Sequence, residues 1–327
     1  MIVYLEAAGG LAILLLGGDA LVRGSVSLAR RFQVPYLLIG LTVVAFGTSA
    51  PELVVGVGAA LEGVPRLALG NVVGSNIANV LLVIGIPALL RPIGCAAFGF
   101  RRDTWLMLIA SAVFILMAWQ GTVGRWDGII LLLLLIAFLA YVGRKGQGDQ
   151  NCPKDGLIDF DALDAPPVPL GRTLFLIAFG IGGLLAGSNL LIGGAIGIAR
   201  AMSIPESVIG LTLVAVGTSL PELATSLAAT LRRHGGVAVG NVIGSNMFNI
   251  LGVMGATAIT TPVPVPPAFL QFDFWIMLGS SALLLPLAYF CNRIGRRAGV
   301  ILVSLYVLYI FAIFHGLMRA GFYNHIP

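Results

Sequence analysis

The sequence predicts an all-α membrane protein with ten transmembrane helices in two inverted five-helix repeats, and with discontinuous helices near the membrane centre. Three observations lead to this prediction: the composition, a repeated pair of motifs, and the distribution of basic residues. Of the 327 residues, 58% are apolar and 10% are charged, whereas soluble proteins carry about 25% charged residues. Apolar runs such as residues 129–142 fit helices in hydrocarbon, because a helix satisfies its own backbone hydrogen bonds. A water-soluble enzyme and a DNA-binding protein are therefore excluded.

Charged or proline-rich gaps divide the chain into apolar segments long enough to cross a membrane. The predicted spans are 2–22, 36–61, 68–90, 104–119, 126–143, 172–196, 206–231, 239–261, 272–291 and 298–318. The first has no basic region and no cleavage site of a signal peptide, so we expect it to remain as a membrane span. The predicted domains are a first repeat at 1–143, a polar linker at 144–171 and a second repeat at 172–327.

The second half of the chain repeats motifs of the first half in one register. Residues 40–53 (GLTVVAFGTSAPEL) and 210–223 (GLTLVAVGTSLPEL) are identical at 11 of 14 positions. Residues 70–85 (GNVVGSNIANVLLVIG) and 240–255 (GNVIGSNMFNILGVMG) match at 10 of 16, and both pairs share an offset of 170 residues. Chance similarity of apolar segments would not match Asn, Ser, Pro and Glu in a single register. The pattern indicates a duplicated half.

An odd number of spans in each repeat makes the second copy enter the membrane from the opposite side. The gaps after the first, third, fifth, seventh and ninth spans contain 15 of the 19 Lys and Arg residues. By the positive-inside rule, these gaps, including the linker, are expected in the cytoplasm and both termini outside. The predicted location is a cell membrane, either an inner or a plasma membrane.

A proline-containing interruption lies about halfway along the second span. Pro51 is predicted to begin a new half-helix, with Thr48 or Ser49 as its cap. The seventh span repeats the pattern at residues 217–222, with Thr218 and Ser219 in the equivalent positions. Both spans are therefore expected to be broken helices, which are typical of transporters.

Each interruption is followed by a carboxylate, Glu52 in the first repeat and Glu222 in the second. We expect each Glu in the first turn of its half-helix. A charged side chain at this depth costs about 2.5 to 3.5 kcal/mol on insertion scales and usually has a function. Neither span contains Lys or Arg near its centre, so a cation is expected to supply the missing charge. The alternative is that each Glu is a protonated, hydrogen-bonded core residue.

The third and eighth spans supply further oxygen atoms. Ser75 and Asn79 lie one helical turn apart on one face, and Ser245 and Asn249 are their counterparts. Small-residue helix packing is the alternative interpretation. The predicted metal-binding residues are Thr48, Ser49, Glu52, Ser75, Asn79, Thr218, Ser219, Glu222, Ser245 and Asn249. Because they offer hard oxygen atoms and no His or Cys, they favour Ca²⁺, with Na⁺ as a competitor of similar size.

The paired GTSxPE and GNxxGSNxxN motifs resemble the two alpha-repeats of the sodium/calcium exchanger family, of prokaryotic type, within the cation/calcium antiporter superfamily. The resemblance covers spans 2 to 3 and 7 to 8, and implies that the ten residues above are ion ligands. It also implies an antiporter that moves Ca²⁺ outward against inward Na⁺ by alternating access. Some family members have Asp at the position of Asn249, so one site charge is absent here.

The expected substrates are Ca²⁺ and Na⁺, with no cofactor, no nucleic acid and no obligatory protein partner. Spans 1 and 6 have no charge at mid-span and are expected to slide as gates over the remaining helices. Two alternatives stay open: a Ca²⁺/H⁺ antiporter that uses the same glutamates, and a non-transporting membrane cation receptor. An enzyme is disfavoured, because no nucleophile and base, phosphate loop or zinc motif stands at a recognisable spacing.

Other polar residues are interpreted as structural. Asp19 lies four residues before Arg23, which predicts an ion pair on one helix face. Residues 203–206 (SIPE) form a predicted capping box at the start of the seventh span. The linker aspartates do not match a calcium-binding loop, and we expect them to be solvated.

Overall fold

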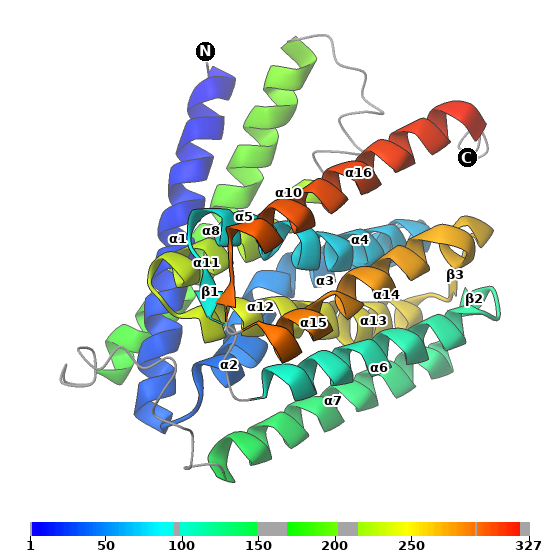
Figure 1. Ribbon diagram of the computed structural model, residues 1–327. Helices are drawn as coiled ribbons and strands as arrows, with labels where there is room; N and C mark the ends of the chain where they lie inside the picture. The colour runs from blue at the N-terminus through cyan, green and yellow to red at the C-terminus, as the bar shows by residue number, and fades with distance from the viewer. Residues whose placement is uncertain (1, 95–98, 149–168, 202–214, 292, 321–327) are drawn as a thin grey trace.

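The computed structural model describes residues 2–94, 99–148, 169–201, 215–291 and 293–320. Long helices make up almost all of the described chain (Figure 1). Residues 149–168 of the predicted linker and the predicted capping box at 203–206 lie outside the described residues.

Helical segments of the first half correspond to the predicted spans, and two of them change helix type along their length. The elements are α1 (Ile2–Phe32), α2 (Tyr36–Ile39), the π-helix η1 (Gly40–Val44), α3 (Ala45–Leu61), α4 (Pro65–Ala78), the π-helix η2 (Asn79–Val83), α5 (Gly85–Leu90), α6 (Phe100–Ala118) and α7 (Arg125–Gly148).

The second half follows the same order where it is described. Its elements are α8 (Leu170–Ala201), α10 (Ala215–Thr218), α11 (Leu220–Leu231), α12 (Gly235–Met247), the π-helix η5 (Phe248–Val253), α13 (Met254–Thr260), the π-helix η6 (Phe269–Asp273), α14 (Phe274–Ala282), α15 (Leu284–Phe290) and α16 (Arg296–Ala320).

Eight helical segments in the described chain are long and apolar enough to cross a membrane. The protein is therefore a helical membrane protein. Two predicted spans are not among these eight. One is α6, which carries Arg101, Arg102 and Asp103 in its first turn, and the other is 206–231, of which residues 206–214 lie outside the described residues. The count of ten spans stays a prediction.

The all-α prediction missed two short antiparallel pairings between loops. β1 (Ile93–Gly94) pairs with β4 (Arg293–Ile294), and β2 (Thr122–Val123) pairs with β3 (Val263–Pro264). β1 and β2 lie at opposite ends of α6 (Figure 1). Two residues per strand are too few for a sequence pattern, yet each pairing connects a loop of the first half to one of the second.

Helices α1 and α8 pack against each other over most of their length, steeply inclined to the other helices (Figure 1). Glycines make this close approach possible. A Cβ atom on Gly10 would lie 2.4 Å from the backbone nitrogen of Leu191, and one on Gly17 would lie 2.7 Å from that of Leu184. A Cβ atom on Gly194 would lie 2.5 Å from the nitrogen of Ala7, so the two helices are antiparallel. Small residues at such contacts are typical of membrane helix pairs.

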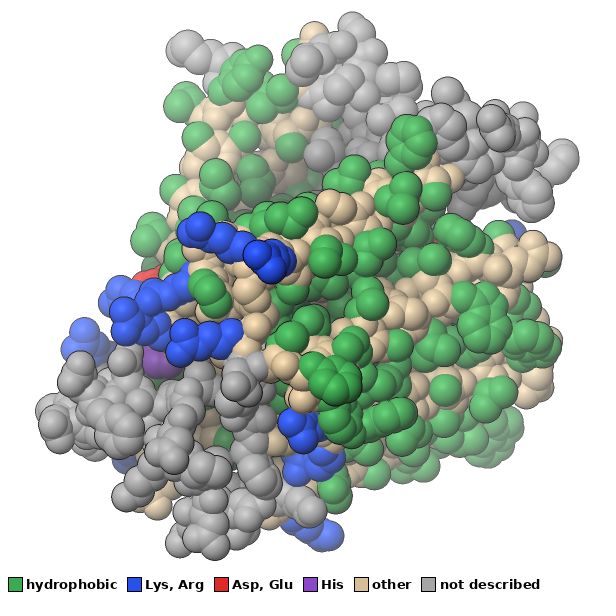
Figure 2. Space-filling view, viewed as in Figure 1, with side chains coloured by type: hydrophobic (Ala, Val, Ile, Leu, Met, Phe, Trp, Pro, Cys, Tyr) green, Lys and Arg blue, Asp and Glu red, His purple; other side chains and the backbone are tan. Residues whose placement is uncertain are grey.

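Apolar and basic side chains are separated on the surface. Hydrophobic side chains cover the lengths of the helices, whereas the described Arg side chains in this view lie mainly at the left, where β1 and α11 lie, and below the centre (Figure 2). At this end Arg91 donates to the carbonyl of Leu231 at 2.8 Å, and Arg101 donates to that of Ala288 at 2.9 Å. Loops that are far apart in the sequence therefore meet at one basic end of the molecule.

Candidate functional site

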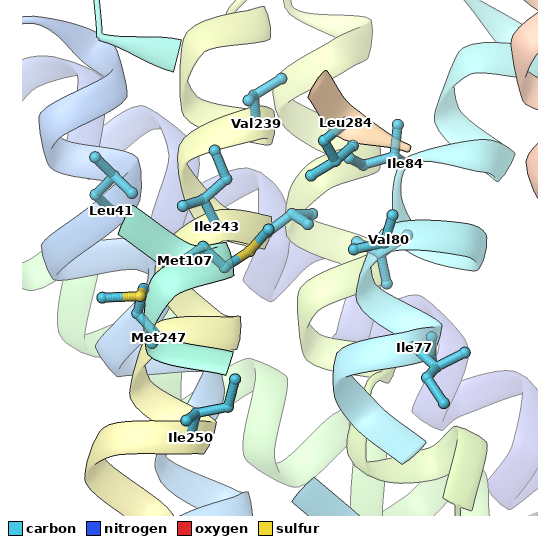
Figure 3. Close-up of a cluster of buried hydrophobic side chains, with 14 of the residues drawn as sticks. Leu41, Ile77, Val80, Ile84, Met107, Val239, Ile243, Met247, Ile250 and Leu284 are labelled. Carbon is cyan, nitrogen blue, oxygen red and sulfur yellow. The ribbon is translucent and has the colours of Figure 1, made fainter. Parts of the chain in front are cut away.

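The ten residues predicted to bind metal are all buried, and none is more than 8% exposed. They come from α3, α4 and η2 in the first half and from α10, α11, α12 and η5 in the second, with Ser219 between α10 and α11. The apolar cluster around these helices includes Leu41, Ile77 and Ile243, which are completely buried (Figure 3). The site is thus enclosed by packed side chains from both halves.

Hydroxyl groups pair between the two halves in a symmetric pattern. The Thr48 and Ser245 hydroxyl oxygens lie 3.4 Å apart, and those of Ser75 and Thr218 lie 3.4 Å apart. The second contact corresponds to the first when each residue number is shifted by 170. In each half, the hydroxyl of a threonine therefore contacts the hydroxyl of a serine from the other half.

Glu52 and Glu222 are both completely buried, and Ser49, three residues before Glu52, reaches Glu222. The Ser49 hydroxyl donates to Oε1 of Glu222 at 3.2 Å, so it crosses from the first half to the carboxylate of the second. Within the described part of the chain, neither carboxylate has an ion-pair partner. The two acids are therefore held close to each other without a cationic side chain.

The predicted break in the second span is wrong. α3 runs as one helix from Ala45 to Leu61 with Pro51 inside it, so Thr48 and Ser49 do not cap a half-helix and Glu52 is not in a first turn. Proline removes one backbone hydrogen bond, but neighbouring helices make this tolerable within a membrane protein.

The corresponding break in the second half is present. α10 ends at Thr218 and α11 begins at Leu220, with Glu222 in its first turn. Ser219 occupies the cap position, although its side chain makes no capping hydrogen bond. The Ser188 hydroxyl donates to the carbonyl of Gly217 at 3.1 Å, which is the carbonyl that Pro221 cannot bond because it has no N–H.

Asn79 and Asn249 both lie in π-helical segments, η2 and η5. Such segments are frequent at functional sites, because the extra residue changes the direction of neighbouring side chains. The Asn79 amide nitrogen donates to Oδ1 of Asn246 at 3.0 Å, and Oδ1 of Asn79 has no partner in the described part of the chain. Neither polar atom of the Asn249 side chain has a hydrogen-bond partner among the described residues.

Several buried polar atoms of the site have no hydrogen-bond partner among the described residues. They are both carboxylate oxygens of Glu52, Oε2 of Glu222, the Ser219 hydroxyl, Oδ1 of Asn79, and Oδ1 and Nδ2 of Asn249. All but Nδ2 of Asn249 are hard oxygens, which suit Ca²⁺ or Na⁺. No group of three His, Cys, Asp or Glu side chains occurs in the described ranges, so a transition-metal site has no support there. The site fits small hard cations.

Two asparagines that the sequence reasoning did not assign belong to the same network. The Thr48 hydroxyl donates to Oδ1 of Asn241 at 3.1 Å, and the Thr218 hydroxyl donates to Oδ1 of Asn71 at 3.1 Å. Both asparagines follow the first glycine of the GNxxGSNxxN motif. Their repetition with the other site residues was the signal that could have identified them.

The ion pair predicted for Asp19 is confirmed. Nε of Arg23 lies 2.8 Å from Oδ2 of Asp19. Nε of Arg232, at the end of α11, also contacts the Asp19 carboxylate. Asp19 therefore connects α1 to α11 as well as to its own helix, which spacing along the sequence could not reveal.

Known proteins are similar to this chain over nearly its whole length. The model of the family described as sodium/calcium exchanger protein matches residues 3–144 and 172–315. The inner membrane protein YrbG of Escherichia coli is 34% identical over 313 residues, covering 92% of this chain and 93% of YrbG. The sodium/calcium exchanger MaX1 of Methanosarcina acetivorans is 30% identical over 338 residues, covering 94% of this chain and 97% of MaX1.

A solved structure of the sodium-calcium exchanger NCX_Mj, soaked with zero Na⁺ and Ca²⁺, is similar over nearly the whole chain. The TM-score is 0.82 at 33% sequence identity, and the match covers 95% of this chain and 99% of that one. The similarity therefore extends well beyond the repeated motifs to the arrangement of the helices.

Proposed function

The chain belongs to the sodium/calcium exchanger family, and from this premise we propose that it exchanges Na⁺ for Ca²⁺ across a membrane by alternating access. Members of this family are membrane ion exchangers, so the chain is a transporter and not an enzyme. The observation that carries the proposal is the pair of buried carboxylates, Glu52 and Glu222, whose oxygens lack cationic partners within the described chain. Two carboxylates balance the charge of one Ca²⁺.

Coupling between the two ions follows from a shared set of ligands. Both ions compete for Glu52 and Glu222, while Ser, Thr and Asn oxygens complete the coordination of either one. A doubly negative site without a cation is a barrier to crossing hydrocarbon, because charge at that depth is costly. The protein therefore switches between its two facing states only when the site holds a cation. Movement of one ion species down its gradient then drives the other species in the opposite direction.

The proposed architecture is two inverted five-helix repeats at 1–143 and 172–327, with ten spans and a cytoplasmic linker at 144–171. The symmetric contacts between Thr48 and Ser245 and between Ser75 and Thr218 support it. The meeting of basic loops at one end of the molecule supports the orientation, with that end in the cytoplasm and both termini outside the cell membrane.

The proposed moving parts are α1 and α8, the first helix of each repeat. Their close pairing supports movement as one unit, and both face the site helices. The side chain of Ser188 in α8 bonds the Gly217 carbonyl, and Gly18 in α1 lies against the backbone of Ala224 in α11. Sliding of this pair would open the site to one side of the membrane at a time.

The net charge moved depends on the number of Na⁺ ions exchanged for each Ca²⁺. If three Na⁺ exchange for one Ca²⁺, as the family resemblance implies, one net charge moves in each cycle. The membrane potential then contributes about 2.3 kcal/mol per 100 mV.

Uptake of radiolabelled calcium into sodium-loaded proteoliposomes tests the proposal. We expect uptake by the wild type that requires internal Na⁺, and a loss of at least tenfold in Glu52→Gln and Glu222→Gln, because each substitution removes one of two site charges. Correct folding of the variants is checked by gel filtration and thermal unfolding in detergent. Undiminished uptake in both folded variants would refute the site, and wild-type uptake that follows a pH gradient and ignores Na⁺ would replace Na⁺ by H⁺.

A further inference from the structure

Two methionines from helices outside the repeated motifs lie against asparagines inside them. The Asn246 amide nitrogen donates to Sδ of Met107 in α6 at 3.5 Å, and the Asn76 amide nitrogen donates to Sδ of Met277 in α14 at 3.7 Å. Both methionines are completely buried, and their numbers differ by 170, as do those of the asparagines. In each half of the molecule, a methionine sulfur therefore accepts a hydrogen bond from an asparagine in the repeated motif of the other half.

The Met107 side chain reaches into the centre of the molecule. It lies between Ile243 and Met247 of α12 on one side and Val80 of η2 on the other (Figure 3). In this apolar position, a thioether sulfur is a weak acceptor available to a buried amide. Met107 thus combines packing with a hydrogen bond to Asn246.

The neighbours of the Asn246 amide fix its orientation. Its nitrogen donates to Sδ of Met107 and to the backbone carbonyl of Asn76 at 3.4 Å, while its Oδ1 accepts from Asn79 at 3.0 Å. A reversed amide would place its oxygen against two acceptors and its nitrogen against the Asn79 donor. Only one orientation satisfies both sides.

Asn246 in turn orients the amide of Asn79. Because the Asn79 nitrogen is bonded to Asn246, its Oδ1 points to the other side of the amide group, where it has no partner among the described residues. Asn79 is completely buried, and an unsatisfied buried acceptor costs about 1 to 3 kcal/mol. A cation that binds this oxygen would remove that cost.

We propose that Met107 and Asn246 are positioning residues, which hold the Asn79 carbonyl oxygen in place for the transported cation through a Met107–Asn246–Asn79 relay. The proposal rests on the proposed function, since it assigns Asn79 as an ion ligand. A ligand oxygen that is already oriented loses little entropy when the ion binds, so the relay raises ion affinity.

The equivalent relay in the other half is incomplete. Asn76 donates to Met277, but its Oδ1 accepts no hydrogen bond, and neither atom of the Asn249 amide has a partner within the described chain. Among the described residues, no hydrogen bond therefore sets the orientation of the Asn249 amide, whereas one sets that of Asn79. The two asparagines at equivalent positions of the repeats thus differ in preorganisation, and only the Asn79 side depends on its methionine.

Calcium binding to purified full-length protein in detergent, measured by isothermal titration, tests the relay. Met107→Leu keeps the volume and removes the acceptor, and we expect Ca²⁺ affinity to fall about two- to fivefold. Met277→Leu is the matched control, with an expected change of less than twofold. Met107→Gln returns an acceptor oxygen near the same place, and we expect it to recover most of the lost affinity.

A double-mutant cycle separates positioning from general packing. In the Asn79→Ala background, the relay has nothing to orient, so Met107→Leu should cause no further loss of Ca²⁺ affinity. Equal losses in Met107→Leu and Met277→Leu, an unchanged affinity in Met107→Leu, or an undiminished effect in the Asn79→Ala background would each overturn the relay. Absence of Ca²⁺ binding by the wild type would instead contradict the proposed function, which keeps the two failures distinct.

Discussion

Asn71 and Asn241 occupy the same position of the repeated motif, but their amides are satisfied differently. The Asn241 nitrogen donates to the Ser226 hydroxyl at 3.0 Å and its Oδ1 accepts from Thr48 at 3.1 Å. The Asn71 Oδ1 accepts from Thr218, whereas its Nδ2 has no partner among the described residues. The position equivalent to Ser226 is Gly56, which has no side chain to accept the bond. Equivalent residues therefore contribute unequally to the stability of the network.

This difference predicts unequal effects of removing the two amides. Asn241→Ala leaves the Thr48 and Ser226 hydroxyls short of a partner in a buried position, and we expect a loss of about 1 to 3 kcal/mol in the free energy of unfolding. Asn71→Ala removes a partly buried side chain whose Nδ2 has no partner among the described residues, and we expect a smaller loss. Thermal unfolding in detergent without Ca²⁺ compares the two, and a larger loss in Asn71→Ala would contradict the prediction.

At the scale of elements, the spacing of glycines decides how α1 and α8 pack. Gly10, Gly17 and Gly24 recur every seven residues in α1, and α8 carries the equivalent glycines at 180, 187 and 194. A seven-residue spacing keeps them on one helix face, so the backbones of the pair approach along a continuous seam. The hydroxyl oxygens of Ser27 and Thr173, 2.8 Å apart, connect the two helices near one end of this seam.

Substituting alanine for glycine in α1 should lower stability where the glycine contacts α8 and raise stability where it does not. A Cβ atom on Gly17 would lie 2.7 Å from the nitrogen of Leu184, so Gly17→Ala must push the helices apart and lower the melting temperature. Gly9 has nothing within 4 Å of an added Cβ, so Gly9→Ala should raise stability, because alanine favours helix by about 1 kcal/mol over glycine. Thermal unfolding of both variants checks the signs, and equal shifts would show that the seam is not tightly packed.

At the scale of the whole molecule, the two halves differ where α1 meets α11. Asp19 of α1 contacts Arg232 at the end of α11, and it also pairs with Arg23. The equivalent residues in the other half are Asn189 and Glu62, which cannot form an ion pair. The ion pair therefore holds α1 against α11 at one end of the site helices, and the equivalent pair of residues cannot do so at the other end.

Loss of this ion pair should shift the balance between the two facing states of the proposed exchange cycle. A partly exposed ion pair contributes about 1 kcal/mol or less, so we expect Asp19→Asn to increase opening between α1 and α11 by up to about fivefold. A cysteine replacing Thr225, which is completely buried beside Gly18, reports opening through its rate of labelling in a protein without other cysteines. Asn189→Ala is the control, since it breaks no ion pair. A labelling rate that is unchanged in Asp19→Asn, or equally increased in both variants, would show that the Asp19 ion pair does not control opening between α1 and α11.

The sequence by itself determined that the chain is a helical membrane protein, which motifs are repeated, and which ten oxygen-bearing residues are candidates for the site. These features are local: hydropathy is a property of each segment, and a shared offset of 170 residues is visible without coordinates. The ten residues inferred in this way are indeed all buried on helices that pack together. Their role as ion ligands stays a prediction.

Only the tertiary structure decided how those residues contact one another. The continuity of α3 through Pro51, the contact of Arg232 with Asp19, and the relay from Met107 to Asn79 all depend on packing between segments that are distant in sequence. A proline pattern cannot reveal whether neighbouring helices support the missing hydrogen bond, and an amide's orientation is fixed by groups on other helices. The chemistry of the site was therefore readable from residue types, but its geometry required the folded chain.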